Sequence, residues 1–93
     1  MVVAALVVDI FIPGSSSLKG KRMVIKGLKD KLRHRFNLSV SEVDHNDLWQ
    51  RAELAIVGVS NEANGLFSVL QRALQLIEGD RRVQVLNYTI ERY

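Results

Sequence analysis

Hydrophobic and polar positions along the first half of the chain predict three regular elements. Val2 to Ile12 is almost continuously hydrophobic and ends at Pro13-Gly14, which is typical of a strand covered on both faces. From about Leu18 to Arg35, apolar residues recur at helical spacing between Lys and Arg, which predicts an amphipathic helix. Asn37 to Asp44 alternates polar with apolar residues and predicts a strand half open to water, followed by a loop from His45 to Trp49.

The second half of the chain predicts a strand, a helix and a last strand. Ala52 to Val59 is rich in β-formers and stops at Ser60-Asn61-Glu62, whose side chains suit the start of a helix. Gly79 stands where a left-handed cap residue would end that helix, and Val83 to Arg92 is the last strand. The buried stripe of the second helix is expected to comprise Leu66, Phe67, Leu70, Ala73, Leu74 and Ile77.

This order of elements predicts the fold. A chain of 93 residues suits one domain, so residues 1–93 are taken as a single unit. For the order β-α-β-β-α-β, right-handed crossovers and short connections favour a ferredoxin-like two-layer α+β sandwich. We therefore expect a four-stranded antiparallel sheet with both helices on one face.

Alternation along the strands assigns their side chains to two faces. The set expected to point toward the helices is Ala4, Leu6, Val8, Ile10, Leu54, Ile56, Leu86, Tyr88 and Ile90. The set expected to point away is Val3, Ala5, Val7, Val43, Ala55, Val57, Val59 and Val85. The outward set is too apolar for water, so we expect it to form the interface of a homodimer or higher oligomer. The alternative to an oligomer is that the side chains are assigned to faces differently, or that terminal residues fold across this face.

Composition narrows the classes of function. The chain has no cysteine, which excludes a disulfide framework and a thiolate nucleophile and is simplest in a reducing cytoplasm. The apolar run Val2 to Val8 is interrupted by Asp9 and is too short to cross a bilayer, so neither export nor membrane anchoring is expected. A domain this small has little apolar material for both a core and a large ligand cavity. We therefore expect no enzymatic activity, no cofactor and no metal.

Positive charge is concentrated in the first predicted helix. Between Lys19 and Arg35 lie eight cations and the single acid Asp30, whereas the rest of the chain has five basic and nine acidic residues. Such a helix can be a solvated surface, or it can form a footprint for phosphate backbones. The central strands carry Val and Ala where RNA-recognition motifs carry aromatic residues, with only Phe11 near that face. Contact with nucleic acid should therefore involve phosphates, with little readout of sequence.

The start of this helix is a candidate anion site. The segment Ser15 to Arg22 places Lys19, Lys21 and Arg22 in the first turn, where the helix dipole favours acids. A phosphate or sulfate held by Ser15, Ser16, Ser17 and these cations would compensate that arrangement. The alternative is that one serine caps the helix while the cations point into solvent.

The loop around His45 has the densest polar chemistry in the chain. Asp44, His45 and Asp47 could ligate a metal or form an acid–base pair, which would indicate a hydrolase or metal enzyme. The same residue types also build tight turns, with Trp49 closing one end of the sandwich. The structural interpretation is favoured, because catalysis needs a concave pocket that a chain this short can scarcely supply.

Three further segments follow one another along the chain: Ser17-Leu18-Lys19-Gly20-Lys21-Arg22, then Ser41 to Asp44 with Asp47 to Ala52, and Val59-Ser60-Asn61. With these segments in this order and separation, essentially the whole chain resembles the YlxP-like bacterial proteins of unknown function. The resemblance implies a ferredoxin-like fold, no established activity and, from frequent encoding beside translation-initiation and ribosome-maturation genes, a role near RNA or the ribosome. Gly20 departs from the longer residue expected there. No catalytic residue is carried over.

The sequence thus favours a small cytoplasmic binding module, a homo-oligomer that engages structured RNA or a ribosomal particle. The residues expected to bind RNA or another anion are Ser15, Ser16, Ser17, Lys19, Lys21, Arg22, Lys26, Lys29, Arg33 and Arg35. The alternative is a protein-interaction or scaffolding subunit that uses the apolar sheet face.

Overall fold

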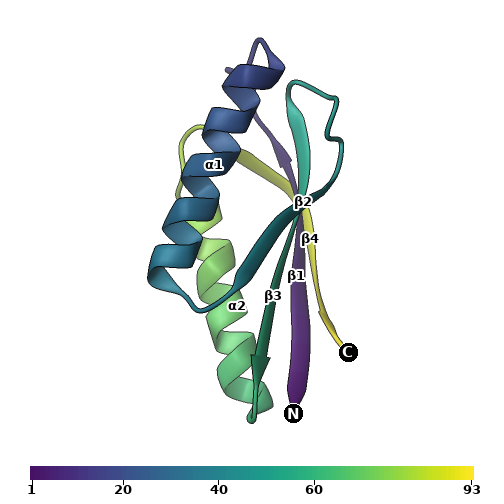
Figure 1. Ribbon diagram of the computed structural model, residues 1–93, viewed down its shortest axis with the longest axis vertical. Coiled ribbons are helices and arrows are strands. Elements are labelled where there is room, and N and C mark those ends of the chain that lie inside the picture. The colour runs from purple at the N-terminus through teal and green to yellow at the C-terminus, as the bar shows by residue number, and fades with distance from the viewer.

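The computed structural model, which describes residues 1–93, has the predicted β-α-β-β-α-β order. Its elements are β1 (Val2–Phe11), α1 (Leu18–Arg35), β2 (Ser39–Asp44), β3 (Arg51–Ser60), α2 (Ala63–Glu78) and β4 (Gln84–Arg92). Figure 1 shows α1 and α2 on the same side of the sheet. The predicted α+β sandwich is therefore confirmed, and α1 has the predicted bounds.

The sheet has four strands in the order β2-β3-β1-β4, and each neighbouring pair is antiparallel. β1 and β3 pair without interruption from Val2 opposite Ser60 to Phe11 opposite Arg51. Because β1 and β3 are central, β2 and β4 form the two free edges of the sheet.

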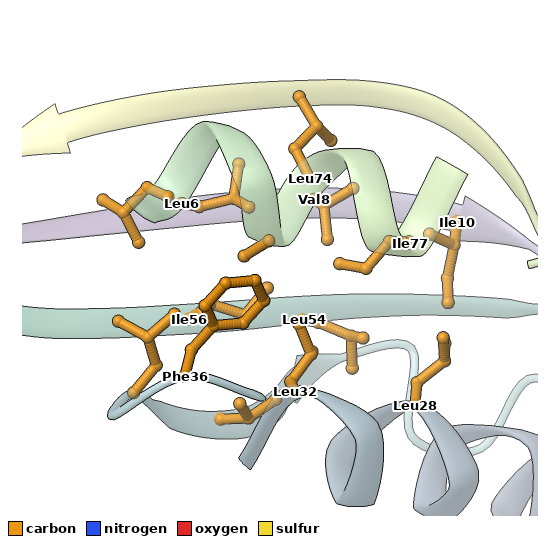
Figure 2. Packing of buried hydrophobic residues seen from close by; sticks show 14 of the residues in the cluster. Leu6, Val8, Ile10, Leu28, Leu32, Phe36, Leu54, Ile56, Leu74 and Ile77 are labelled. Carbon is orange, nitrogen blue, oxygen red and sulfur yellow. The ribbon is translucent and has the colours of Figure 1, made fainter. Parts of the chain in front are cut away.

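The hydrophobic core lies between the sheet and the helices. Alternate residues of the central strands, among them Leu6, Val8 and Ile56, are fully buried, as the alternation predicts. Figure 2 shows them packed against Leu28 and Leu32 of α1 and against side chains of α2. Burial of apolar surface of this kind is the main source of folding free energy.

The predicted faces of β4 need correction. Asp9 pairs with Asn87 whereas Ile10 pairs with Val85, so Leu86 is an extra residue in β4. Such a bulge breaks the period of two. Val85 consequently packs against the core instead of pointing away from it, and Leu86, expected under the helices, is 46% exposed. Tyr88 keeps the side of its partner Val8, yet 45% of its surface is exposed.

The turn between α2 and β4 is organised by Asp80. Gly79 ends α2 with φ −79°, so it is right-handed and not the left-handed cap that its position suggests. Asp80 accepts hydrogen bonds from the backbone and guanidinium of Arg82 and lies 3.6 Å from the ammonium of Lys31. These contacts tie the turn to α1. The hydrogen bond from Arg82, supported by the charges of Arg82 and Lys31, lowers the pKa of Asp80 from 3.8 to about 2.

Asp80→Asn is expected to lower the free energy of unfolding at pH 7 by about 1–2 kcal/mol, a value reduced because both cationic partners are exposed. The folded pKa is depressed, so the contribution is present above pH 3.8 and is lost as the pH falls toward 2. Urea denaturation across this pH range should show that the free energies of unfolding of the wild-type protein and Asp80→Asn converge at low pH. Glu78→Gln, on an exposed carboxylate nearby, should change little, and a pH-independent difference would contradict the assignment.

Candidate nucleic-acid interface

Four cations of α1 lie along one side of the helix and form what we call the basic stripe: Arg22, Lys26, Lys29 and Arg33. Their spacing of four, three and four residues places successive side chains on one helical face. Together with Ile25, Asp30 and Glu42, they line an open groove of about 390 Å³ beside β2. The stripe brings together four of the predicted RNA-binding residues.

The cations of α1 differ in how far the chain already neutralises them. Lys26 forms an exposed ion pair with Asp30 at 3.0 Å, and Arg33 donates to the Val40 carbonyl at 3.1 Å. No carboxylate of the chain lies within ion-pair distance of Arg22 or Lys29. The stripe therefore keeps a net positive charge.

Two further predicted cations lie at the ends of α1. Lys19 is exposed in the first turn and forms no ion pair. Arg35 is exposed at the last residue of α1, with its guanidinium 5.9 Å from the centre of the Phe36 ring. Neither residue lines the groove, although both add to the positive potential of α1.

Lys21 is not part of this surface, which corrects its assignment as an RNA-binding residue. Its side chain is 1% exposed, and its ammonium donates to the carbonyls of His45 at 2.6 Å and Leu48 at 2.7 Å. The same ammonium lies 2.9 Å from Glu42 Oε2, a shielded atom whose one polar contact is this ion pair. Lys21 thus joins α1 to the loop between β2 and β3, which Figure 1 shows beside the start of the helix.

The loop that contains Asp44, His45 and Asp47 is a turn built around this lysine. His45 adopts φ 64°, and its carbonyl accepts from Leu48 as well as from Lys21. Asp44 accepts a hydrogen bond from the His45 backbone, with its carboxylate 3.9 Å from His45 Nδ1. No three His, Asp or Glu side chains in the chain are grouped as metal ligands. The contacts of the loop are those of a structural element.

Two of the three serine hydroxyls before α1 form hydrogen bonds with the protein backbone. Ser17 is the N-cap, and its hydroxyl accepts from the Gly20 amide at 3.0 Å. Ser15 is buried and donates to the Ser17 carbonyl. Of the three hydroxyls proposed for an anion, only that of Ser16 is on an exposed residue. The capping alternative therefore describes Ser17, and the anion site loses Ser15, Ser17 and Lys21 from its proposed ligands.

The fold brings residues into this region that the local sequence pattern does not indicate. Arg81 and Arg82, from the turn after α2, line a hollow of about 380 Å³ together with Pro13, Gly14 and Ser16. They are far from Ser16 in sequence but near it in space because β1 and β4 are neighbours. Glu42 was missed as the partner of Lys21, although its position two residues after the buried Val40 placed it on the helix side of β2.

The open face of the sheet, opposite the helices, is less apolar than predicted. Ala5 is 4% exposed and the partly buried Val85 packs against the core, so neither offers much contact area on this face. Val43 lies at a second register shift, between Glu42 and Asp44. The remaining apolar residues on this face are Val3, Val7, Ala55, Val57 and Val59.

Acids occupy the same open face. Asp9 lies opposite Glu53 in the central strands, and Glu91 lies opposite Ala5. Arg51 neutralises Asp9 through a two-point ion pair. The two layers thus carry opposite charge, with cations along α1 and carboxylates on the sheet.

The fold and surface define the chain as a small ferredoxin-fold protein with a basic helix. The structure is similar to the solution structure of a designed protein, LFR1 1, with ferredoxin fold: the TM-score is 0.59, and the match covers 100% of this chain and 84% of the designed one. At 18% identity, this likeness shows the fold alone. Neither helix is both long enough and apolar enough to span a membrane.

Comparison of the sequence then identifies the family. The profile described as "Protein of unknown function (DUF503)" matches residues 3–90. The uncharacterized protein YlxP of Bacillus subtilis (strain 168) is 38% identical over 64 residues, which span 69% of this chain and 70% of the relative. The chain belongs to the DUF503 family, and the predicted resemblance is confirmed.

Proposed function

We propose that this protein is a small, cytoplasmic, non-enzymatic module that binds the phosphate backbone of structured RNA through the basic stripe of α1. The observation that carries the proposal is that Arg22 and Lys29 have no carboxylate partner in the chain while they share a groove with Lys26 and Arg33. At about 1.5 Å per residue, the stripe extends for about 16 Å along the helix. This length suits several successive phosphates.

The charge of the two layers supports an approach from the helix side. The open face of the sheet carries Glu53 and Glu91, which would repel a phosphate backbone, whereas Asp9 is neutralised by Arg51. Among the open-face residues of the central strands, Phe11 is the single aromatic, so bases have no stacking platform there. Contacts made by Lys and Arg to phosphates position a protein without reading bases. We therefore propose recognition of duplex RNA by charge and shape, and ribosomal RNA is the natural target given the family resemblance.

The test is titration of a fluorescent ribosomal RNA duplex at two salt concentrations. We compare the wild-type protein with a stripe variant, Arg22→Gln/Lys26→Gln/Lys29→Gln. Loss of three phosphate contacts should weaken binding by about tenfold to a hundredfold at low salt and make the dependence of affinity on salt shallower. Arg33 is left intact because it also holds the β2 backbone.

The matched control removes the same charge elsewhere, as Lys31→Gln/Arg72→Gln/Arg92→Gln, three exposed residues that line neither the groove beside β2 nor the hollow that contains Arg81. It should weaken binding by less than about threefold. Equal losses in the two variants would show attraction to net charge alone. Absence of wild-type binding at low salt would also contradict the proposal.

The open face of the sheet supports a second candidate function, a surface that recruits another protein. The observation in its favour is the run Val3, Val7, Val57 and Val59, of which Val59 is 65% exposed. Small side chains and neighbouring acids make this patch weaker than the sequence suggests. In a pull-down, ribosomal components should then stay bound after ribonuclease treatment, and Val57→Lys should abolish their binding. That result would favour this function over RNA binding.

A further inference from the structure

The outer edge of β4 offers unused backbone hydrogen-bonding groups. β4 pairs with β1 on one side and has no strand on the other. The Tyr93 amide donates to Val3 of β1, whereas the Tyr88 amide donates to the side chain of its own neighbour, Asn87, at 2.9 Å. Successive residues of a strand point their backbone N–H and C=O groups toward opposite neighbouring strands. The backbone of Tyr88 therefore faces away from β1, toward the free edge.

The side chains of β4 do not protect this edge. The seven residues from Gln84 to Ile90 include no charge and no proline. Leu86 and Tyr88 are 46% and 45% exposed, which is high for such large hydrophobic residues. Soluble proteins usually protect a free edge with charge, proline, a bulge or a covering segment. From Gln84 to Ile90, β4 has a bulge at Leu86 but no charge, proline or covering segment, and its large hydrophobic residues Leu86 and Tyr88 remain exposed, which indicates a surface that is normally paired.

The opposite edge of the sheet, formed by β2, is better protected than the β4 edge. β2 has six residues, of which Glu42 and Asp44 are acidic. Arg33 already donates to the backbone carbonyl of Val40. The β2 edge is thus short, charged and partly occupied by the chain, whereas β4 is nine residues long, open, and charged only at its last two residues, Glu91 and Arg92.

We propose that two copies of this chain pair antiparallel through β4, around a twofold axis at Tyr88. In that register Tyr88 faces Tyr88 of the second copy. Leu86 then faces Ile90 and Asn87 faces Thr89, so apolar residues meet apolar ones and polar residues meet polar ones. Cross-strand pairs matched in this way stabilise a sheet, in addition to the backbone hydrogen bonds. From Leu86 to Ile90 the sequence of β4 is therefore complementary to itself, whereas further out Val85 would face Glu91.

The proposed pairing extends the sheet across both copies, with β4 of each at the centre and β2 of each at the outside. Because the twofold axis is perpendicular to the sheet, all helices lie on one side of the dimer. The two basic stripes would then lie on the same side of the dimer, one near each outer β2 strand. The two open sheet faces stay uncovered, in contrast to the oligomer interface expected from the alternation of the strands.

The first test is sedimentation of charge variants at the proposed centre. The wild-type protein should sediment at twice the 10.5 kDa chain mass. Tyr88→Lys and Tyr88→Glu should each sediment as monomers, because like charges would face one another across the axis. An equimolar mixture of the two should recover the dimer. This recovery is specific to a register in which residue 88 faces itself.

A cysteine variant tests the same register covalently. The chain has no cysteine, so Tyr88→Cys introduces a single thiol. Hydrogen-bonded antiparallel pairs have Cα atoms about 5.5 Å apart, within the range for a disulfide. Mild oxidation should give a covalent dimer at a protein concentration where Ser41→Cys, on the β2 edge, gives mostly monomer.

Three results would overturn the proposal. They are a wild-type monomer at high concentration, charge variants of Tyr88 that stay dimeric, and preferential cross-linking of Ser41→Cys. Dissociation by Val57→Lys in place of the Tyr88 variants would assign the interface to the open sheet face. Circular dichroism establishes that each variant is folded, and the cysteine test applies even if a charged residue at position 88 impairs folding. Sedimentation needs no RNA, so its result is independent of the proposed function.

Discussion

Lys21→Met is expected to lower the free energy of unfolding by about 3–5 kcal/mol, the largest effect we predict for a single substitution. The ammonium is the partner of the shielded Glu42 carboxylate and of the His45 and Leu48 carbonyls. Removing it leaves the Glu42 charge unpaired and the Leu48 carbonyl without its lysine donor, while the His45 carbonyl keeps only the Leu48 amide. Urea denaturation followed by circular dichroism measures the loss.

Two variants separate this explanation from general disturbance of α1. Arg22→Met changes the adjacent exposed residue and should cost less than about 0.5 kcal/mol. Lys21→Met combined with Glu42→Leu should recover part of the loss, because no buried charge is then left unpaired. Hydrogen exchange should be faster from 45 to 50 in Lys21→Met. A double variant less stable than Lys21→Met alone would contradict the buried ion pair.

Gly58→Val is expected to cost about 2–3 kcal/mol, because the site has no room for a side chain. Gly58 lies in β3 opposite the buried Ala4. A Cβ atom there would come within 2.7 Å of methyl groups of Leu38 and Leu66, both in the core. The methyls must move, and with them the contact between α2 and the sheet. The change in melting temperature measures this cost.

Gly14→Val is the matched control, since a Cβ atom at Gly14 would meet nothing within 4 Å. It should leave the melting temperature almost unchanged. Trimming the obstructing side chain offers a second check. Gly58→Val should cost less in a Leu66→Ala background than in the wild-type protein, because the two sites share one space. Equal costs in the two backgrounds would show that packing against Leu66 is not the cause.

Charge on α1 has one structural role and one role that we propose, in binding RNA. Lys21 points inward and holds the loop between β2 and β3, while the basic stripe points outward beside β2. Adjacent residues in a helix are about 100° apart, so Lys21 and Arg22 can serve the core and the surface from consecutive positions. Stability should therefore depend on Lys21, and RNA affinity on Arg22, Lys26 and Lys29.

Local patterns in the sequence determined the element order, the bounds of α1 and the buried side of the central strands. These properties depend on neighbouring residues: a period near 3.6 favours a helix, and a period of two or a continuous apolar run favours a strand. The concentration of cations between Lys19 and Arg35 is likewise a property of the chain. The family resemblance rested on three short segments and needed no coordinates.

The tertiary structure alone decided which of these cations reach solvent and which edge of the sheet is open. Lys21 and Arg22 are alike in sequence, but Glu42 and two loop carbonyls lie beside Lys21 once β2 packs under α1. The exposure of Leu86 and the inward turn of Val85 follow from one extra residue in β4, whose position depends on pairing with β1. Such contacts join residues that are distant along the chain, and therefore no local pattern encodes them.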